Sequence, residues 1–245
     1  MINIFKIGII GNSVALRNRP AEAIPYNKNY GALLQQSLQN EVPDSVVEVK
    51  NMALGRATIL DIEKNIDNII NYFPDIFIIN IGVVGASTRE IPLWYSDAIQ
   101  RNSKNIFSYQ MAALHHFVMK KNRSLFVKLR GKRTWISEKV FEKKYQWLVE
   151  FIRKETNASI IAITINSGNN RLEAAIPGSR KNYSSYNKII SEIAEKNNFP
   201  VIDVSDLISE KHFPDGVHYN SAGHKIVAQR LLSLVKKILE ERKAV

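Results

Sequence analysis

The sequence predicts an α/β fold, a three-layer sandwich around a parallel sheet of five strands in a flavodoxin-like order. Five short runs rich in isoleucine and valine are separated by segments with helical spacing. Most of these runs are continuously apolar rather than alternating, which is typical of strands that helices cover on both faces. Strands that alternate with helices indicate right-handed crossovers between parallel strands.

The five apolar runs are the expected strands, at residues 2–10, 46–52, 76–82, 159–165 and 200–204. The expected helices lie at residues 28–40, 58–72, 93–121, 135–155, 181–197 and 221–242. Residues 93–155 are too many for one simple crossover, so we expect a helical insertion there, with a loop near Asn122 or Gly131. The sequence has no internal repeat and no linker-like segment, so residues 1–245 are predicted to form a single domain.

The composition is that of an ordinary globular protein, with 45% hydrophobic and 23% charged residues. The absence of cysteine excludes a disulfide framework, a thiol nucleophile and thiolate metal ligands. The N-terminal residues lack the basic start and the long apolar stretch of a signal peptide, and no window reaches the roughly 18 apolar residues of a spanning helix. We therefore expect a cytoplasmic protein, either free or peripheral to the inner face of the membrane.

The formal net charge of +11 is concentrated in one region. Residues 120–154 contain twelve lysines and arginines against three glutamates, a net +9, which favours an anionic partner. Within the basic segment 120–133, apolar residues such as Leu125 and Leu129 lie among the charged ones. A solvated helix face, contact with an anionic membrane surface and nucleic-acid binding all fit this pattern. Nucleic acid is the least favoured, because no binding module surrounds the segment.

Residues suited to nucleophilic catalysis stand after the first and the last expected strands. Ser13 follows the run KIGIIGN, and Asp215 and His218 share the loop PDGVH. Because the carboxyl ends of parallel strands lie at one edge of the sheet, we expect these residues to meet there. A serine, an imidazole that takes its proton and a carboxylate that orients the imidazole form a catalytic triad.

No pattern in the sequence indicates a cofactor or a metal. The run GIIGN lacks the third glycine of a dinucleotide-binding fingerprint. No grouping of His, Asp and Glu has the spacing of a metal site. We interpret His115, His116 and His224 as structural or surface residues, and we expect neither a metal nor an organic cofactor.

Three blocks of the sequence together resemble the SGNH (GDSL-type) hydrolase family. GNS at residues 11–13 resembles its nucleophile block, DGVH at residues 215–218 its last block, and Gly55 in NMALGRAT its second block. The resemblance implies that Ser13 attacks an ester carbonyl, that His218 is the base and that Asp215 orients His218. It also implies that the backbone N–H groups of the serine and of Gly55 form the oxyanion hole.

Two departures from the family pattern bear on catalysis. Asn12 replaces the usual aspartate of the first block, and Val84 stands where the third block normally has an asparagine that donates to the oxyanion. Losing one such donor typically costs about 10²–10³ in rate. The run from Gly82 to Arg89 resembles a variant block, Gly-Ile-Val-Asp-x-x-Pro-Arg, of SGNH-like proteins encoded with bacterial surface-polysaccharide genes. The expected substrate-binding residues are Asn12, Gly82, Arg89 and Arg17, because backbone at a strand end and guanidinium groups can hold a substrate.

The resemblance implies an esterase that removes a small acyl group, such as acetyl, from a sugar or glycan precursor in a bacterial cell. Two alternatives stay open. The same triad can transfer the acyl group to a sugar hydroxyl, which would make the protein an acyltransferase. The loss of the third-block asparagine also fits a catalytically weak protein that binds a glycan or an anionic surface.

Overall fold

The computed structural model describes residues 3–16, 24–101, 106–207 and 209–243, and its centre is a five-stranded sheet in which all strands are parallel. The strand order is β2-β1-β3-β4-β5, which confirms the predicted flavodoxin-like arrangement. The strands are β1 (Asn3–Gly11), β2 (Ser45–Asn51), β3 (Ile76–Asn80), β4 (Ser159–Ile163) and β5 (Val201–Ile202).

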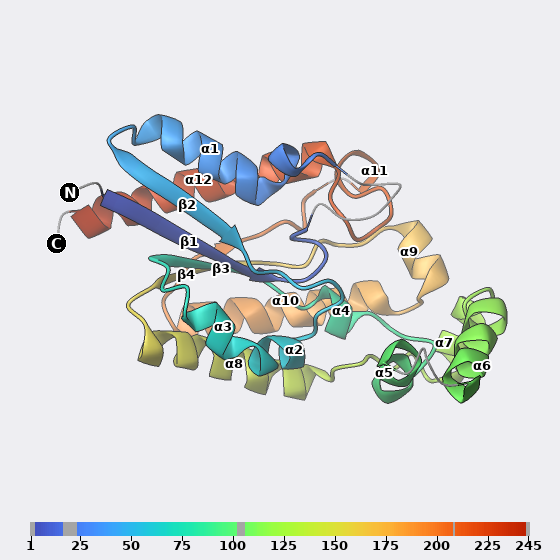
Figure 1. Cartoon of the computed structure of the whole chain (residues 1–245). Helices are drawn as coiled ribbons and strands as arrows, with labels where there is room; N and C mark the ends of the chain where they lie inside the picture. Colours follow the sequence, from blue (N-terminus) through green and yellow to red (C-terminus); the bar gives the residue numbers. More distant parts are fainter. Residues whose placement is uncertain (1–2, 17–23, 102–105, 208, 244–245) are drawn as a thin grey trace.

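Helices cover both faces of the sheet and complete the three layers (Figure 1). One face carries α1 (Tyr30–Glu41) and α12 (Ser221–Lys243), which pack against each other. The opposite face carries α2 (Ile59–Lys64), α3 (Ile66–Ile70), α8 (Glu138–Glu155) and α10 (Ser179–Lys196). Right-handed crossovers produce this division, because the chain moves first to one side of β1 and then to the other.

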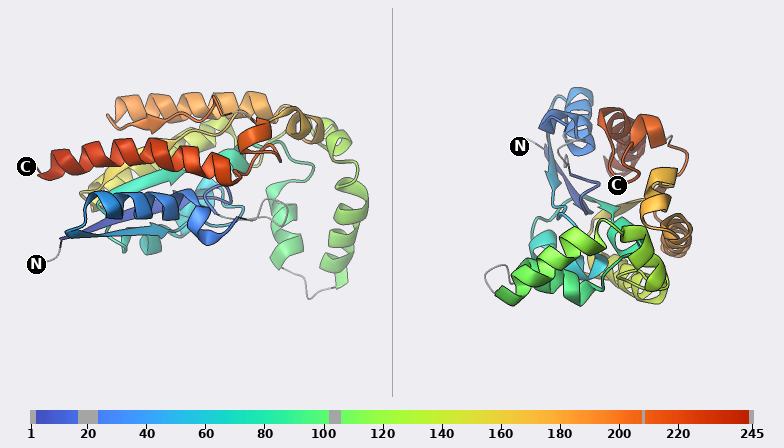
Figure 2. Two further views of the ribbon diagram at one scale, coloured as in Figure 1. Left: turned by 90° about the horizontal axis from the view of Figure 1, so that it is seen from above. Right: turned by 90° about the vertical axis from the view of Figure 1, so that its right-hand side faces the viewer.

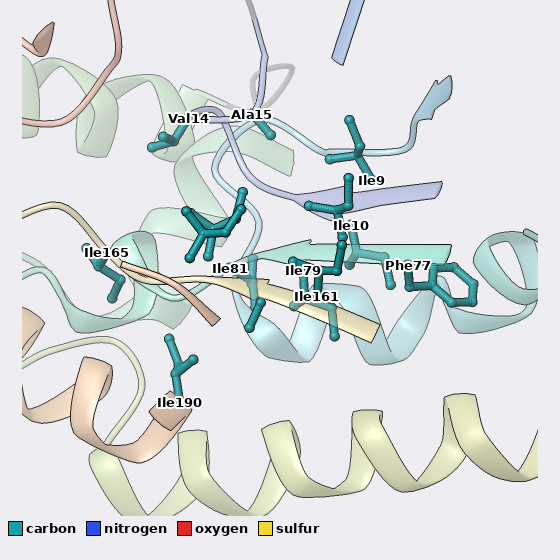
Figure 3. Close-up of a cluster of buried hydrophobic side chains, with 14 of the residues drawn as sticks. Ile9, Ile10, Val14, Ala15, Phe77, Ile79, Ile81, Ile161, Ile165 and Ile190 are labelled. Atoms are coloured by element: carbon teal, nitrogen blue, oxygen red, sulfur yellow. The ribbon is translucent and has the colours of Figure 1, made fainter. Parts of the chain in front are cut away.

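The strands are continuous apolar runs because both faces of the sheet are buried. Every residue of β3 is buried, whereas β2, at the edge, alternates between buried and exposed positions from Ser45 to Glu48. Figure 3 shows part of this core: Ile9, Ile79 and Ile161 come from three different strands, and Ile190 of α10 points toward the sheet. Removing these side chains from water is the main stabilising contribution to the fold.

The predicted insertion forms a group of helices beyond the carboxyl ends of the strands (Figures 1 and 2). The chain turns at both expected positions: Asn122 is the N-cap of the last of these helices, and Gly131 follows it with a φ of +65°. The expected continuous helix 93–121 is divided instead into separate pieces. The insertion consists of α5 (Leu93–Arg101), α6 (Ile106–Leu114), the π-helical turn η2 (His115–Met119) and α7 (Arg123–Leu129).

The insertion and the ends of the described chain lie at opposite ends of the molecule. β1 begins and α12 finishes at the amino edge of the sheet, whereas α5, α6 and α7 lie past its carboxyl edge (Figures 1 and 2). The loops that leave the strands therefore face the insertion. This is the edge at which the sequence places the catalytic residues.

Two further differences from the predicted elements are local. The expected helix 58–72 is divided at Asn65 into α2 and α3. In the described part of the chain, α4 (Val83–Ala86), α9 (Asn170–Ala175) and α11 (Ser209–His212) lie outside the predicted helices, as α7 does, and the short turn η1 (Tyr26–Lys28) begins before the expected helix 28–40. Among the helices of the described ranges, none is both long and apolar enough to cross a bilayer.

Candidate active site

Ser13 is held in a tight turn directly after β1. The side-chain oxygen of Asn12 accepts a hydrogen bond from the Val14 N–H at 3.0 Å, and the Ala15 N–H donates to the Asn12 carbonyl at 3.0 Å. Asparagine commonly closes turns in this way, because its short side chain mimics a backbone carbonyl. The turn leaves Ser13 almost buried at the carboxyl edge of the sheet.

Two asparagines from neighbouring elements anchor this turn. The side-chain amides of Asn29 and Asn51 both donate to the carbonyl of Ala15, at 2.8 and 2.7 Å. Asn29 is also the N-cap of α1, where its side-chain oxygen accepts the N–H of Gly31. The position of Ser13 is thereby fixed relative to both the start of α1 and the end of β2.

The loop between α11 and α12 brings His218 and Asp215 to Ser13. The Oγ of Ser13 lies 2.9 Å from Nε2 of His218, and Nδ1 of His218 lies 2.7 Å from Oδ2 of Asp215. The other carboxylate oxygen accepts the backbone N–H groups of Val217 and His218, at 2.8 and 2.7 Å. These three predicted residues therefore meet, although 205 positions separate Ser13 from His218.

Hydrogen bonds determine the charge of Asp215 and the tautomer of His218. Burial by itself raises the pKa of Asp215, but the hydrogen bonds from the His218 side chain and from the backbone outweigh burial and hold this pKa below its usual value. An ionised carboxylate can only accept, so Nδ1 of His218 carries the proton. Nε2 is then free to accept from the Ser13 hydroxyl, which general-base activation of a serine requires.

A cavity of about 570 Å³ lies beside Ser13, Asp215 and His218. Its apolar wall is formed by Val83, Val84, Leu172, Ala175, Ile176 and Val217. Four arginines from four segments also line it: Arg56 after β2, Arg89 after α4, Arg123 at the start of α7 and Arg171 in α9. The cavity therefore combines the serine with an apolar surface suited to an acyl group and with strong positive charge.

Arg89 lies against Val84, the residue that stands where the third block normally has asparagine. Its Nη2 donates to the Val84 carbonyl at 2.9 Å, and its guanidinium lies 4.1 Å from the centre of the Trp135 ring. Its Nε is buried and has no hydrogen-bond partner among the described residues. Burial, followed by the charges of Arg123 and Arg56, lowers the pKa of Arg89 to about 10, so the group is still cationic at neutral pH.

Three of the other predicted site residues, Asn12, Gly55 and Gly82, do not line the cavity. Gly55 lies in an exposed turn immediately before Arg56, and Asn12 is buried. Gly82 precedes α4 with a φ of +137°, and an added Cβ would meet Ile165 Cδ1 at 2.9 Å, so this position requires glycine. Arg17 lies outside the described residues.

Three of the cavity arginines are absent from the sequence-based prediction of the site. Arg56 follows Gly55 in the second block, so its place after a strand end is a usable signal. Arg123 belongs to the basic segment 120–133, but its position in the cavity depends on how the insertion folds back over the sheet. Arg171 lies on α9, a helix too short to leave a periodic pattern.

Two histidines outside the site, His224 and His115, contact other side chains of the fold. His224 is buried against the rings of Tyr30 and Tyr219, and its Nδ1 accepts the Tyr30 N–H at 3.2 Å. Nε2 of His115 lies 3.1 Å from Glu90. Within the described ranges, no group of three or more His, Asp or Glu side chains could hold a metal ion.

A family model described as the GDSL-like lipase/acylhydrolase family matches residues 9–226, a span that includes Ser13, Asp215 and His218. The chain belongs to this family. Membership makes the protein a GDSL-type serine hydrolase of the esterase class, and the all-parallel sheet agrees with the GDSL hydrolase fold. No curated protein matches this GDSL-type hydrolase in sequence.

Several solved structures share the fold of this GDSL-type hydrolase. A lipase/acylhydrolase from Enterococcus faecalis is 17% identical, with a TM-score of 0.62 over 95% of this chain and 96% of that one. A catalytic mutant of Axe2, an acetylxylan esterase from Geobacillus stearothermophilus, is 20% identical, with a TM-score of 0.60 over 95% and 94%. The acetyl xylan esterase AlAXEase is 18% identical, with a TM-score of 0.62 over 94% and 100%.

Proposed function

We propose that this GDSL-type hydrolase is a serine esterase that removes an acetyl group from a sugar or a glycan precursor through a triad of Ser13, His218 and Asp215. The observation that carries the proposal is the line of hydrogen bonds from Ser13 through His218 to Asp215, with heavy-atom distances of 2.9 and 2.7 Å. The acetyl group is supported by two structural neighbours, Axe2 and AlAXEase, which are acetyl xylan esterases.

The proposed reaction proceeds in two stages. The Oγ of Ser13 attacks the ester carbonyl while Nε2 of His218 takes the hydroxyl proton, and Asp215 stabilises the resulting imidazolium. The tetrahedral intermediate collapses as His218 gives this proton to the leaving sugar oxygen, which departs as a hydroxyl and leaves an acetyl ester on Ser13. His218 then takes a proton from water, whose oxygen attacks the acetyl ester. The second tetrahedral intermediate collapses as His218 gives that proton to Oγ of Ser13, and acetic acid is released.

Three groups are proposed to stabilise the oxyanion: the backbone N–H of Ser13 and the guanidinium of Arg89, which both line the cavity, and the backbone N–H of Gly55, in the turn directly before the cavity residue Arg56. Val84 has no side-chain donor, whereas Arg89 already lies against the Val84 carbonyl. If Arg89 acts on the oxyanion, Arg89→Ala lowers kcat by about 10²–10³. The matched control is Arg153→Gln, an exposed arginine in the last turn of α8. An unchanged kcat in the alanine variant removes Arg89 from the oxyanion site.

Hydrolysis of p-nitrophenyl acetate by the wild type, Ser13→Ala and His218→Ala tests the esterase proposal. We expect turnover in the wild type only, together with stoichiometric labelling of the wild type, but not of Ser13→Ala, by a fluorophosphonate. Absence of both turnover and labelling favours the alternative of a glycan-binding protein. Acetyl transfer to an added sugar, with little free acetate, favours the acyltransferase alternative.

We further propose that the basic segment 120–133 contacts the anionic inner face of a membrane and that the enzyme works in the cytoplasm at that surface. Leu125 and Leu129 of α7 are 55% and 72% exposed, and the exposed Lys121 and Lys128 lie beside them in sequence. Exposed leucines among lysines are what an interfacial segment requires.

Sedimentation with vesicles of phosphatidylglycerol and phosphatidylcholine tests this surface. We expect the wild type to bind the anionic vesicles, and the double variant Leu125→Ser/Leu129→Ser to bind them less. Val140→Ser, which changes an exposed valine on α8, is the control. Equal binding by wild type and double variant contradicts the proposal.

A further inference from the structure

The cavity beside Ser13 contains far more positive than negative charge. Among the residues that the structure describes, its walls include four arginines and one acidic residue, Asp215. Both carboxylate oxygens of Asp215 already accept hydrogen bonds from the His218 side chain and from the backbone. Asp215 is therefore committed to the triad, and it does not neutralise the arginines across the cavity.

Neighbouring residues compensate only part of this arginine charge. Nε of Arg123 lies 2.8 Å from Glu90, which also lies 3.1 Å from His115. Arg56 donates to the Ser96 hydroxyl at 2.8 Å, which places its guanidinium beside α5. Arg171 is exposed and forms no ion pair with any residue of the described ranges.

Trp135 holds two of the arginines close together. Its ring centre lies 4.1 Å from the guanidinium of Arg89 and 5.5 Å from that of Arg56, and its indole N–H donates to the Ile91 carbonyl at 2.9 Å. The buried Nε of Arg89 has no hydrogen-bond acceptor within the described part of the chain. Like charges held at such proximity repel each other, and a bound anion would remove this cost.

We propose that Arg56 and Arg171 bind an anionic group of the substrate, so that the ester hydrolysed by Ser13 belongs to a sugar bearing a phosphate or a carboxylate. Guanidinium groups suit both anions, because their N–H groups match paired oxygens. The apolar wall on the same cavity is left for the acetyl group. This inference rests on the proposed esterase function and specifies its substrate class.

Three esters that share the same 3-O-acetyl group test the inference: the derivatives of methyl glucoside, glucose 1-phosphate and methyl glucuronoside. We expect kcat/KM for at least one of the two anionic esters to exceed that for the neutral one by about tenfold or more. Arg171→Gln and Arg56→Gln should each reduce this preference about tenfold, chiefly through KM, because a charged hydrogen bond is lost. Arg153→Gln, the exposed control on α8, should leave the preference unchanged.

Anion binding can also be measured without turnover. We expect inorganic phosphate or glucuronate to raise the Tm of the wild type at matched ionic strength, whereas chloride and glucose do not. The shift should shrink in Arg171→Gln and Arg56→Gln and stay in Arg153→Gln. Whether phosphate or glucuronate gives the larger shift distinguishes a sugar phosphate from an acidic sugar.

The two proposals fail separately. A wild type that hydrolyses the neutral ester as well as the anionic ones, with no anion-dependent Tm shift, overturns the anionic substrate and leaves the esterase in place. An anion-dependent Tm shift without any turnover or labelling of Ser13 keeps the anion site and overturns the esterase.

Discussion

At the scale of single residues, the site depends on short polar side chains that fix loops rather than on long ones. Asn12 closes the turn that carries Ser13, and the amides of Asn29 and Asn51 anchor that turn. Asp215 is fixed in the same way: one carboxylate oxygen accepts backbone N–H groups, and the other accepts the side chain of His218. Each catalytic group is therefore placed before a substrate arrives.

The first residue-scale prediction concerns Asp215→Asn. An amide can donate a hydrogen bond to Nδ1, which favours the tautomer that presents an N–H rather than a lone pair to Ser13. We expect kcat on p-nitrophenyl acetate to fall by about 10³–10⁴ with the fold retained. Asp206→Asn, which changes an exposed carboxylate paired with Arg230, should keep the wild-type kcat. Full activity in Asp215→Asn contradicts the proposed orienting role.

The second residue-scale prediction concerns acid stability and His224. Burial, followed by the charge of His218, lowers the pKa of His224 to about 4 from its ordinary 6.5. Below pH 6.5 the unfolded chain takes up a proton that the folded chain does not, so the free energy of unfolding falls until about pH 4. The total loss is about 3 kcal/mol.

Denaturant unfolding of wild type and His224→Gln between pH 7 and pH 4 measures this effect. Glutamine keeps an acceptor for the Tyr30 N–H but does not titrate. We expect the stability of the wild type to fall relative to the variant across this range. Parallel curves for the two proteins would assign acid sensitivity to other groups.

At the scale of elements, the segment after β4 supports the loop that carries the triad. The side-chain amides of Asn166 and Asn169 donate to the carbonyls of Val217 and Pro214, at 2.8 and 3.3 Å. Gly216 lies between these carbonyls with a φ of +85°. The loop therefore depends on a glycine and on two asparagines from another part of the chain.

The element-scale prediction compares two glycines with positive φ. In Gly216→Ala the new Cβ meets Asn169 Oδ1 at 2.5 Å and Leu172 Cβ at 2.7 Å, so the loop must move. We expect a loss of more than about 1 kcal/mol in stability and a lower kcat. In Gly131→Ala the φ of +65° gives backbone strain, but no atom lies within 4 Å of the new Cβ. This control should lose some stability and retain kcat, and a similar kcat loss in both variants would contradict the argument.

A comparison of α8 with α9 shows which helices can be predicted from sequence patterns alone. The strands and the long helices were predictable because burial imposes a period on many consecutive residues, as in α8, where Phe141, Tyr145, Leu148, Val149 and Ile152 are buried. The short α9 has only Leu172 buried and is fixed by tertiary contacts. Its sequence alone contains too few turns to identify a helix.

At the scale of the whole molecule, the meeting of Ser13, His218 and Asp215 was predictable and the arginine cluster was not. The triad residues follow from the rule that parallel strands end at one edge, which applies before any contact is known. The four cavity arginines come from four separate segments, and one of these belongs to an insertion whose path the sequence does not reveal. A single guanidinium has no local pattern that distinguishes it from a surface charge.

The whole-molecule prediction concerns ionic strength. The chain carries a formal charge of +11, and the cavity concentrates part of it beside Ser13. We expect kcat/KM for an anionic acetyl ester to fall several-fold between about 50 and 500 mM NaCl, because salt screens both attraction and binding. Hydrolysis of a neutral ester should change little. Equal salt dependence for both esters would argue against an electrostatic role of the cluster.

The opposite placement of the chain ends and the insertion has a practical consequence. A carrier protein or an affinity label joined before β1 or after α12 would extend from the amino edge of the sheet, away from the catalytic serine (Figures 1 and 2). The enzyme can therefore be tethered to a bead, a sensor or a cell surface by either end. In each case the carboxyl edge of the sheet, where Ser13 lies, would be at the end of the molecule away from the attachment.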